Sequence, residues 1–254
     1  MINEAGDYRP VEAQLTVAAA RATELADVRP GERLLDVCCG TGNAAAAGFT
    51  AGAIVTGIDL DPGQVDAAHQ QVPAGTFLVA DAMSLLFADD SFDVVVSTFG
   101  VSFLPGAPAA DELLRVVRGG GRIVITSWGP AGSLLSAGGI LGRAVAQAQG
   151  HPAFASSVIA WHDRATVREL FAPHRSQFSD EQIVFTAVSG HAVAQQYYER
   201  HPQWLKARQI VGETAYRQLQ QRAARHFNEI NEHASAWQAT DRYLASVVTV
   251  DSDQ

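Results

Sequence analysis

Cysteine is scarce in this sequence: it occurs twice among 254 residues, and the two positions, Cys38 and Cys39, are adjacent. Adjacent cysteines cannot build the framework of spaced disulfides on which small secreted domains depend. The sequence therefore excludes a disulfide scaffold, and we interpret both cysteines as small apolar side chains. We also expect no metal site.

Positive charge and long apolar runs are lacking as well. Lys206 is the only lysine, and 18 basic residues stand against 27 acidic ones, which gives a formal net charge of −9. Affinity for nucleic acid rests on basic side chains that neutralise phosphates, so this balance favours a small-molecule acceptor as partner over RNA or DNA. No apolar run approaches the roughly 20 residues of a membrane span, and the first ten residues carry no signal-peptide pattern. We expect a cytoplasmic protein with no membrane partner; a homodimer stays open.

What the chain does contain is a regular alternation of apolar runs and helical patterns. We expect seven strands, at residues 33–37, 53–58, 76–79, 92–97, 122–127, 181–188 and 242–250. Helical patterns separate the first five, which is typical of parallel βαβ units with right-handed crossovers. Gly119 to Gly121 are expected to close the helix at 109–117. The fold class that follows is α/β, with a Rossmann-like sheet.

The first strand ends in a glycine turn, and the second ends in a carboxylate. The turn Gly40-Thr41-Gly42 follows the run LLDV, and Asp59 closes the second apolar run. Glycines bring bare backbone close to a ligand, and the helix behind them offers unpaired N–H groups. A carboxylate at this distance along the chain is suited to the hydroxyls of a ribose. The pattern predicts a cofactor that contains adenosine, although a tight strand–helix turn without a ligand is the alternative.

The residues of the turn favour one such cofactor. A dinucleotide fingerprint needs a third glycine that is missing here. Asp36, at the end of the first strand, would repel a pyrophosphate but suits an ammonium group. S-adenosylmethionine carries an amino group and a sulfonium and no phosphate, so the residue types favour the methyl donor over NAD.

The turn resembles motif I of the class I S-adenosylmethionine-dependent methyltransferases, (D/E)-x-G-x-G-x-G. Asp36, Gly40 and Gly42 match, and Cys38 stands where the first glycine normally is. Three further segments resemble motifs of that family in the expected order: FLVADA at 77–82, LFADDSFD at 86–93 and RVVRGGGR at 115–122. The relatives they suggest are the small-molecule methyltransferases similar to those of ubiquinone and menaquinone biosynthesis.

The resemblance implies a single domain over 1–254. Residues 1–128 would form the cofactor-binding core, and the segments 129–165 and 191–235 a helical lid that binds the acceptor. The strands at 181–188 and 242–250 would close a seven-stranded sheet that is mostly parallel, with an antiparallel last strand and helices on both faces.

The resemblance also assigns site residues at the adenosine end. Asp59 would accept hydrogen bonds from both ribose hydroxyls, and Leu60 would pack on the adenine face. Asp81 would bind the adenine amine, with the amide of Ala82 or Met83 offered to a ring nitrogen. The alternatives are a solvated Asp59 at a strand end, and a helix cap for Asp81.

At the methionine end, Asp36 and the carbonyls near Cys38 would hold the amino acid portion, with Gly40, Thr41 and Gly42 allowing its close approach. Asp36 could instead be structural and hold the glycine loop. A further contact is expected from the carbonyl of Ser97. The rings of Phe99 and Phe103 are candidates to shape the pocket around the sulfonium, and plain core packing is the alternative for both. Tyr8 is a candidate to fold over the cofactor.

Methyl transfer requires a general base only when the nucleophile must lose a proton. The sequence offers several histidines after residue 150, of which His162 and His191 are our catalytic candidates because their segments are expected to border the acceptor pocket. The alternative for each is a surface or capping histidine, which is the commoner role of a single histidine. His151, His201, His226 and His233 are the other candidates.

The leading hypothesis is transfer of a methyl group to an O, N or C atom of a small organic acceptor in secondary-metabolite or quinone-type biosynthesis. A methyltransferase-fold cyclase or pericyclase, and a non-catalytic module that binds the cofactor, are alternatives with the same motif I. An NAD-dependent oxidoreductase is disfavoured by the missing third glycine.

Overall fold

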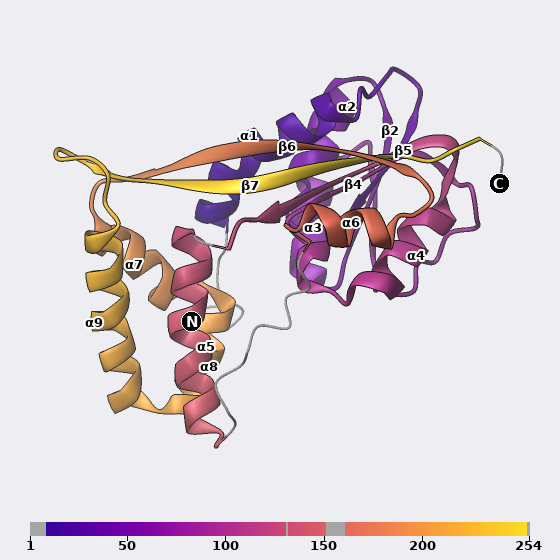
Figure 1. Ribbon diagram of the computed structural model, residues 1–254. Helices are drawn as coiled ribbons and strands as arrows, with labels where there is room; N and C mark the ends of the chain where they lie inside the picture. The colour runs from indigo at the N-terminus through magenta and orange to yellow at the C-terminus, as the bar shows by residue number, and fades with distance from the viewer. Residues whose placement is uncertain (1–8, 131, 151–160, 253–254) are drawn as a thin grey trace. The chain divides into compact units, whose positions relative to one another are not determined.

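The computed structural model describes residues 9–130, 132–150 and 161–252, which fall into two compact units (Figure 1). We call them the sheet unit (15–128, 161–181 and 243–252) and the helical unit (9–14, 129–130, 132–150 and 182–242). Tyr8 and His151, two residues that the sequence put forward, lie outside the described residues.

The strands of the described chain form one seven-stranded sheet in the order β3-β2-β1-β4-β5-β7-β6. Their bounds are β1 Arg33–Val37, β2 Ile54–Asp59, β3 Thr76–Val79, β4 Phe92–Thr98, β5 Val117–Trp128, β6 Arg175–Ala187 and β7 Trp237–Thr249. Neighbours among the first five strands pair in parallel, whereas β7 runs antiparallel to β5. The expected sheet, mostly parallel with an antiparallel last strand, is confirmed.

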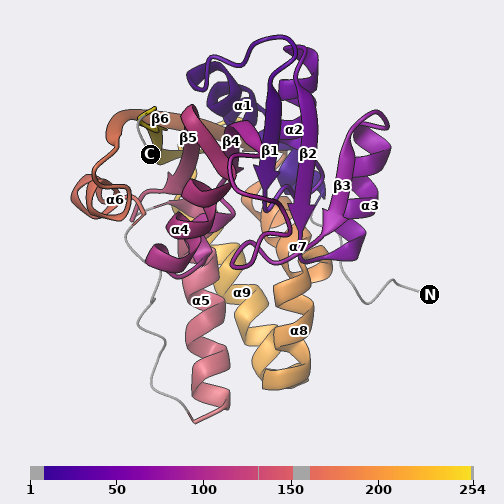
Figure 2. The ribbon, with the colours of Figure 1, turned by 90° about the vertical axis from the view of Figure 1, so that its right-hand side faces the viewer.

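Helices accompany the parallel strands, as Figure 2 shows for the region around β1 to β5. Helix α1, Arg9–Leu25, precedes β1, and the short α6, Arg164–Leu170, follows β5. Between them, α2 Asn43–Thr50 connects β1 to β2, α3 Pro62–Gln71 connects β2 to β3, and α4 Gly106–Val116 connects β4 to β5. Local signals determine the start of α3: Asp61 accepts a hydrogen bond from the Gly63 amide at 2.7 Å, and Pro62 occupies the first helical position, where its missing N–H has no partner to lose.

The sheet unit has apolar packing on both faces of its strands. Side chains of a strand alternate between faces, so Leu35, Val37 and Val95 lie in one cluster and Leu34 and Val94 in another. The first cluster includes buried residues of α4 and α6, and the second includes alanines of α1 and α2. Helices on both faces are thereby confirmed.

The structure corrects the expected glycine turn before β5. Gly119 to Gly121 belong to the strand, which begins at Val117, and the pairing with β4 shifts between Phe92 and Val94. A Cβ on Gly121 would come within 2.9 Å of the Asp93 carbonyl oxygen. Glycine is needed here because two backbone segments approach closely. No periodic pattern in the sequence indicates that these segments will meet.

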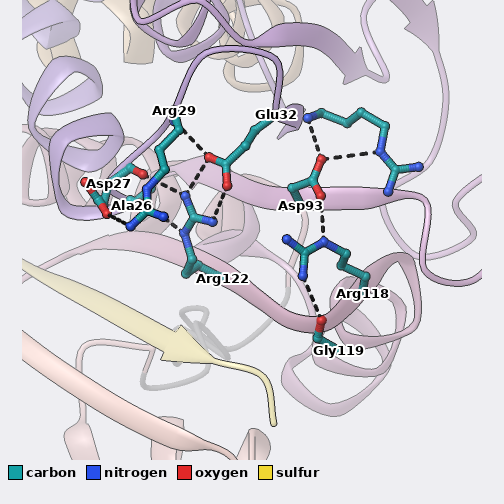
Figure 3. A network of polar contacts seen from close by, with 9 residues as sticks. Ala26, Asp27, Arg29, Glu32, Asp93, Arg118, Gly119 and Arg122 are labelled. Carbon is teal, nitrogen blue, oxygen red and sulfur yellow. Dashed lines mark hydrogen bonds and ion pairs between the residues drawn. The ribbon is translucent and has the colours of Figure 1, made fainter. Parts of the chain in front are cut away.

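Ion pairs tie the amino ends of three strands together on the side opposite the glycine turn (Figure 3). The Arg122 guanidinium donates to both Glu32 oxygens at 2.7 and 2.8 Å and to the Ala26 carbonyl at 2.7 Å. Asp93 in turn accepts from the side chains of Arg33 and Arg118. The network joins the loop before β1 to β4 and β5 and fixes the end of the sheet that lies away from the candidate site.

Four helices make up most of the helical unit: α5 Ser133–Ala148, α7 Gly190–Arg200, α8 Pro202–Val211 and α9 Glu213–Glu229. Helix α5 packs on α8 and α9, and α7 packs on both as well (Figures 1 and 2). Their core is aromatic, with buried Tyr197, Trp204, Tyr216, Phe227 and, from β7, Trp237. None of the helices that the structure describes is long and apolar enough to cross a membrane.

Candidate cofactor site

The glycine turn after β1 is built from backbone conformations that most residues avoid. Cys38, Gly40 and Gly42 all have positive φ, at 58°, 54° and 87°. The Cys39 amide donates to the Ile58 carbonyl at 2.8 Å, and the Gly42 amide donates to the Cys39 carbonyl at 2.8 Å. The turn thus lies against the end of β2, and Thr41 within it is largely buried. Glycine accepts these conformations freely, whereas cysteine does so with strain.

Asp59 connects the end of β2 to this turn. Its carboxylate accepts hydrogen bonds from the Gly40 amide and the Asp61 amide, each at 3.0 Å. A carboxylate has about four acceptor positions, so Asp59 keeps capacity for two hydroxyl donors. Leu60, the next residue, is 64% exposed beside it. The arrangement is compatible with the ribose and adenine roles expected of these two residues.

Asp36 is buried more deeply than a side chain that only contacts a ligand would need to be. It is 1% exposed, and its side chain accepts a hydrogen bond from the Ala45 amide at 2.9 Å, in the first turn of α2. Burial raises the pKa of Asp36 to about 7, an effect that the Ala45 hydrogen bond opposes. The geometry favours the structural alternative, in which Asp36 holds the glycine loop by binding the helix behind it.

Asp81 follows β3 in an exposed turn and accepts a hydrogen bond from the Met83 amide at 2.9 Å. The turn is not continued into a helix, so Asp81 is not the helix cap that was the alternative. Of the two amides expected to meet the adenine ring, that of Met83 is already engaged by Asp81. Ala82 is buried between them.

Cys38 lies in the turn between these acidic residues along the chain. Burial, and then the charges of Asp59, Asp36 and Asp81, raise the pKa of Cys38 to about 12. Burial likewise raises the pKa of Cys39. Both cysteines are therefore neutral thiols near pH 7 and not nucleophiles, as the sequence led us to expect. The carboxylates make this part of the sheet edge favourable for a cation.

The end of β4 is fixed by buried hydroxyls. Ser97 Oγ donates to the Val37 carbonyl at 2.7 Å and accepts from the Val101 amide at 3.2 Å. Phe99 has a φ of 65°, and its amide donates to Thr126 Oγ1 at 3.0 Å. Backbone strain of this kind persists where the surroundings hold it, and it is common at ligand sites.

The Phe99 ring is packed in the interior. It is 4% exposed and lies parallel to the Trp128 ring, with centroids 3.7 Å apart, while the Tyr243 ring meets it edge-on. One face of Phe99 is therefore covered by Trp128. Phe103, in the 3₁₀ helix η1 (Val101–Phe103), is 62% exposed, so the two rings do not share one environment. Their roles around a sulfonium stay predictions.

The sequence reasoning missed Gly100. A Cβ at this position would stand 2.2 Å from the Cβ of Cys38. Cysteine at position 38 thus requires glycine at position 100. The only signal in the sequence was the departure from glycine in motif I, which gives no indication of where the compensating space lies.

The structure places the two catalytic candidates in different units. His162 is half-buried in the sheet unit, next to Asp163, which caps α6 through the Thr166 amide. His191 is exposed in the first turn of α7, in the helical unit. Their roles stay predictions. Among the described residues, no three His, Cys, Asp or Glu side chains are grouped so that they could hold a metal ion.

Comparison with known proteins agrees with this geometry. Residues 35–125 match the family model described as a methyltransferase domain. An uncharacterised protein of Mycobacterium tuberculosis is 34% identical over 177 residues, which are 67% of this chain and 64% of that protein. Demethylmenaquinone methyltransferase of Beutenbergia cavernae is 40% identical over 101 residues, 39% of this chain and 42% of that protein.

Among solved structures, that of the YcgJ protein of Bacillus subtilis is similar, with a TM-score of 0.59 over 92% of this chain and 99% of that one. Their identity is 19%, so this likeness concerns the fold. The chain spans between 39% and 64% of the length of the curated relatives that it matches. The methyltransferase domain at 35–125, the sheet order and the glycine turn together support a class I S-adenosylmethionine-dependent methyltransferase.

Proposed function

We propose that this protein transfers the methyl group of S-adenosylmethionine to an O, N or C atom of a small organic acceptor, and that the acceptor is a phenol or quinol. The observation that carries the choice of cofactor is the hydrogen bond from the Gly40 amide to Asp59 at 3.0 Å, which holds the carboxylate at the end of β2 against the glycine turn. The name of the Beutenbergia cavernae relative, a demethylmenaquinone methyltransferase, supports a quinol among the possible acceptors.

The charges around the turn favour this cofactor over a nucleotide with phosphates. A sulfonium and an ammonium gain energy near carboxylates, and a pyrophosphate loses it. The effect is strongest where water is excluded; Asp36 is buried, but its pKa of about 7 means that it carries a full charge only above neutral pH. We therefore expect the chain to discriminate against NAD by charge as well as through the missing third glycine of its turn.

The described residues divide the binding of such a cofactor among three strand ends. Asp59, at the end of β2, would accept hydrogen bonds from the ribose hydroxyls, and Leu60 would cover the adenine ring. Asp81, after β3, is exposed and would accept from the adenine amine. The turn after β1 would bring its backbone against the methionine portion. When bound, the cofactor supplies a methyl carbon that already carries a good leaving group.

The chain's own contribution to the reaction is then positioning and the exclusion of water. The hydroxyls of Ser97 and Thr126 hold the end of β4 rigid, so the backbone there would meet the ligand without rearranging. We further propose that the helical unit binds the acceptor. Its aromatic core and its mixed charges suit a partly apolar molecule of moderate size.

Isothermal titration with S-adenosylmethionine, S-adenosylhomocysteine and NAD tests the cofactor. We expect the first two to bind and NAD not to bind. Incubation with a methyl-labelled donor and a panel of phenols, quinols, amines and enols tests the reaction, and label in a product that appears together with S-adenosylhomocysteine is the expected result.

Two outcomes contradict the proposal in different ways. If a folded protein binds none of the three ligands, the glycine turn is structural. If the cofactor binds and label never leaves it, the chain is a binding module or a cyclase that retains the methyl group.

A further inference from the structure

Within the sheet unit, one arginine of helix α4 holds the segment between β3 and β4. The Arg115 guanidinium donates to the carbonyls of Leu85 and Phe87 at 3.0 and 2.7 Å. It also donates to Asp89 Oδ1 at 2.9 Å and forms a two-pronged pair with Glu112, one turn earlier on α4, at 2.7 and 2.8 Å. These five hydrogen bonds match the five N–H donors of a guanidinium. The donor capacity of Arg115 is therefore used in holding this segment and its own helix neighbour.

Glu112 completes the attachment of this segment to α4. Its Oε2 accepts a hydrogen bond from the Leu85 amide at 2.6 Å, so side chains of α4 bind both the amide and the carbonyl of Leu85. The Glu112 and Arg115 side chains are only 20% and 30% exposed. Their hydrogen bond lowers the pKa of Glu112, which keeps the carboxylate ionised near neutral pH. Hydrogen bonds that involve a charged group are shorter and stronger than neutral ones, and Leu85 is therefore held firmly against the helix.

Leu85 directly follows the turn that carries Asp81. In this turn the Ser84 amide donates to the Asp81 carbonyl at 3.1 Å, and the Met83 amide donates to Asp81 Oδ1 at 2.9 Å. The position of the Asp81 carboxylate thus depends on the backbone of Met83 and Ser84, which is continuous with Leu85. Whatever holds Leu85 also restrains the turn.

The two ends of the turn are held in different ways. At the first end, the Ala80 amide donates to the Asp59 carbonyl at 3.0 Å, so the sheet fixes the backbone. At the second end, the chain forms no strand until β4 begins at Phe92, and the side chains of α4 hold the backbone at Leu85. Asp81 itself is exposed, so packing restrains its side chain little. The hydrogen bonds at the two ends therefore determine where its carboxylate lies.

We propose that Arg115 and Glu112 are positioning residues for cofactor binding, because they fix the turn so that the Asp81 carboxylate meets the adenine amine. The inference rests on the proposed function, in which Asp81 accepts from that amine. With Oδ1 held by the Met83 amide, the second oxygen of Asp81 has lone pairs for the ligand. A displaced turn would lengthen and bend that hydrogen bond, and hydrogen bonds weaken steeply when their geometry is poor.

Two matched ligands test the inference: S-adenosylhomocysteine, and S-inosylhomocysteine, in which an oxygen replaces the amino group of the base. They share the ribose and the amino acid, so the ratio of their affinities reports the contact at that edge of the base. By calorimetry on the full chain, we expect the adenine ligand to bind about tenfold to hundredfold more tightly, the value of a hydrogen bond to a charged group. Asp81→Ala should remove most of this adenine preference.

Arg115→Lys keeps the charge but cannot form the two-pronged pair and hold two carbonyls at once. It should lower the adenine preference by about tenfold. Arg118→Lys is the matched control. Arg118 also donates to a carboxylate, that of Asp93 at 2.6 Å, but at the end of the sheet away from the candidate site (Figure 3), so this variant should keep the preference. A general loss of stability weakens the binding of both ligands equally and cancels in the ratio.

A conservative variant and a double variant separate positioning from folding. Glu112→Gln keeps an oxygen for the Leu85 amide and should retain more of the adenine preference than Glu112→Ala, which keeps none. Asp81→Ala combined with Arg115→Lys should show the same ratio of affinities as Asp81→Ala alone, because the arginine acts through that carboxylate. Should Glu112→Ala fail to fold, Arg115→Lys and Glu112→Gln still decide the question.

A folded Arg115→Lys protein with the wild-type preference overturns the inference, since the pair would then only stabilise the fold. Equal losses in Arg115→Lys and Arg118→Lys do the same, and so does equal binding of the two ligands by the wild type. Failure of the proposed function looks different. A folded wild type that binds neither ligand refutes the cofactor and, with it, the inference. A preference that depends on Arg115 without any transfer of label supports the positioning role and refutes the methyltransferase activity.

Discussion

The Cβ atom of Cys38 fills the space that a side chain at position 100 would need, so that a Cβ added to Gly100 would stand 2.2 Å from it. The two residues belong to neighbouring strand ends, since β1 pairs with β4 in parallel. Gly100 itself has ordinary helical φ and ψ, and Cys38 alone therefore makes glycine necessary there.

This relationship predicts a rescue. Gly100→Ala should reduce the free energy of unfolding by about 1–3 kcal/mol through overpacking and should weaken cofactor binding by displacing the turn. Cys38→Gly should restore both, because it removes the clashing Cβ and relaxes a φ of 58°. Urea unfolding of the two single variants and the double variant measures the coupling. Strictly additive effects would show that the two positions are independent.

Asp59 should be the main polar contact to the cofactor. Asp59→Asn keeps one oxygen for the turn amides but loses the charge, and we expect about tenfold to hundredfold weaker binding of S-adenosylmethionine by calorimetry. Asp66→Asn, at an exposed position on α3, is the matched control and should bind normally. Wild-type affinity in a folded Asp59→Asn protein would remove this residue from the site.

Stability should depend on pH through Asp36. Its pKa is raised from 3.8 to about 7 by burial, so the native state binds the proton more tightly than the unfolded state does. The unfolding free energy should therefore decrease as the pH rises from about 4 to about 7, by up to about 4 kcal/mol from this group.

Asp36→Asn cannot ionise and keeps an oxygen for the Ala45 amide, so its urea-unfolding midpoints should vary less with pH over the same window. The difference between wild type and variant isolates Asp36 from other titrating groups. Parallel pH curves for the two proteins would contradict the raised pKa.

Arg122 should stabilise the sheet, and Arg29 should not. Arg122 and Glu32 form a two-pronged pair with side chains only 17% and 15% exposed, and Arg122→Lys cannot reproduce it. We expect a loss of about 2–3 kcal/mol. Arg29→Lys alters an ion pair with Asp27 whose side chains are 71% and 74% exposed, so it should change stability by less than about 1 kcal/mol. Chemical denaturation of both variants gives the comparison, and similar losses would show that burial is not what matters.

The sequence by itself determined the features that depend only on residues close together in the chain, such as strand bounds, helix caps and turns. The bounds of β1 and β3, the Asp61 cap with Pro62 behind it, and the glycine turn agree with the structure. Strand alternation, helical periodicity and capping each act within a few residues, and four short motifs in order were enough to indicate the family.

Other features were decided only when distant residues met. Gly121 lies within β5 and not in a turn before it, and the Asp93 carbonyl leaves no room for a side chain there. Strands β6 and β7 are also longer than the apolar runs at 181–188 and 242–250 that predicted them. The Asp36 carboxylate accepts a hydrogen bond from the Ala45 amide of α2, and the Phe99 ring stacks on Trp128 of β5. Ser136 Oγ contacts the His226 ring across 90 positions, and the Ser133 amide donates to Asp241 across 108. Such contacts depend on which surfaces the folded chain brings together. A local sequence pattern does not identify the distant residue that it will contact.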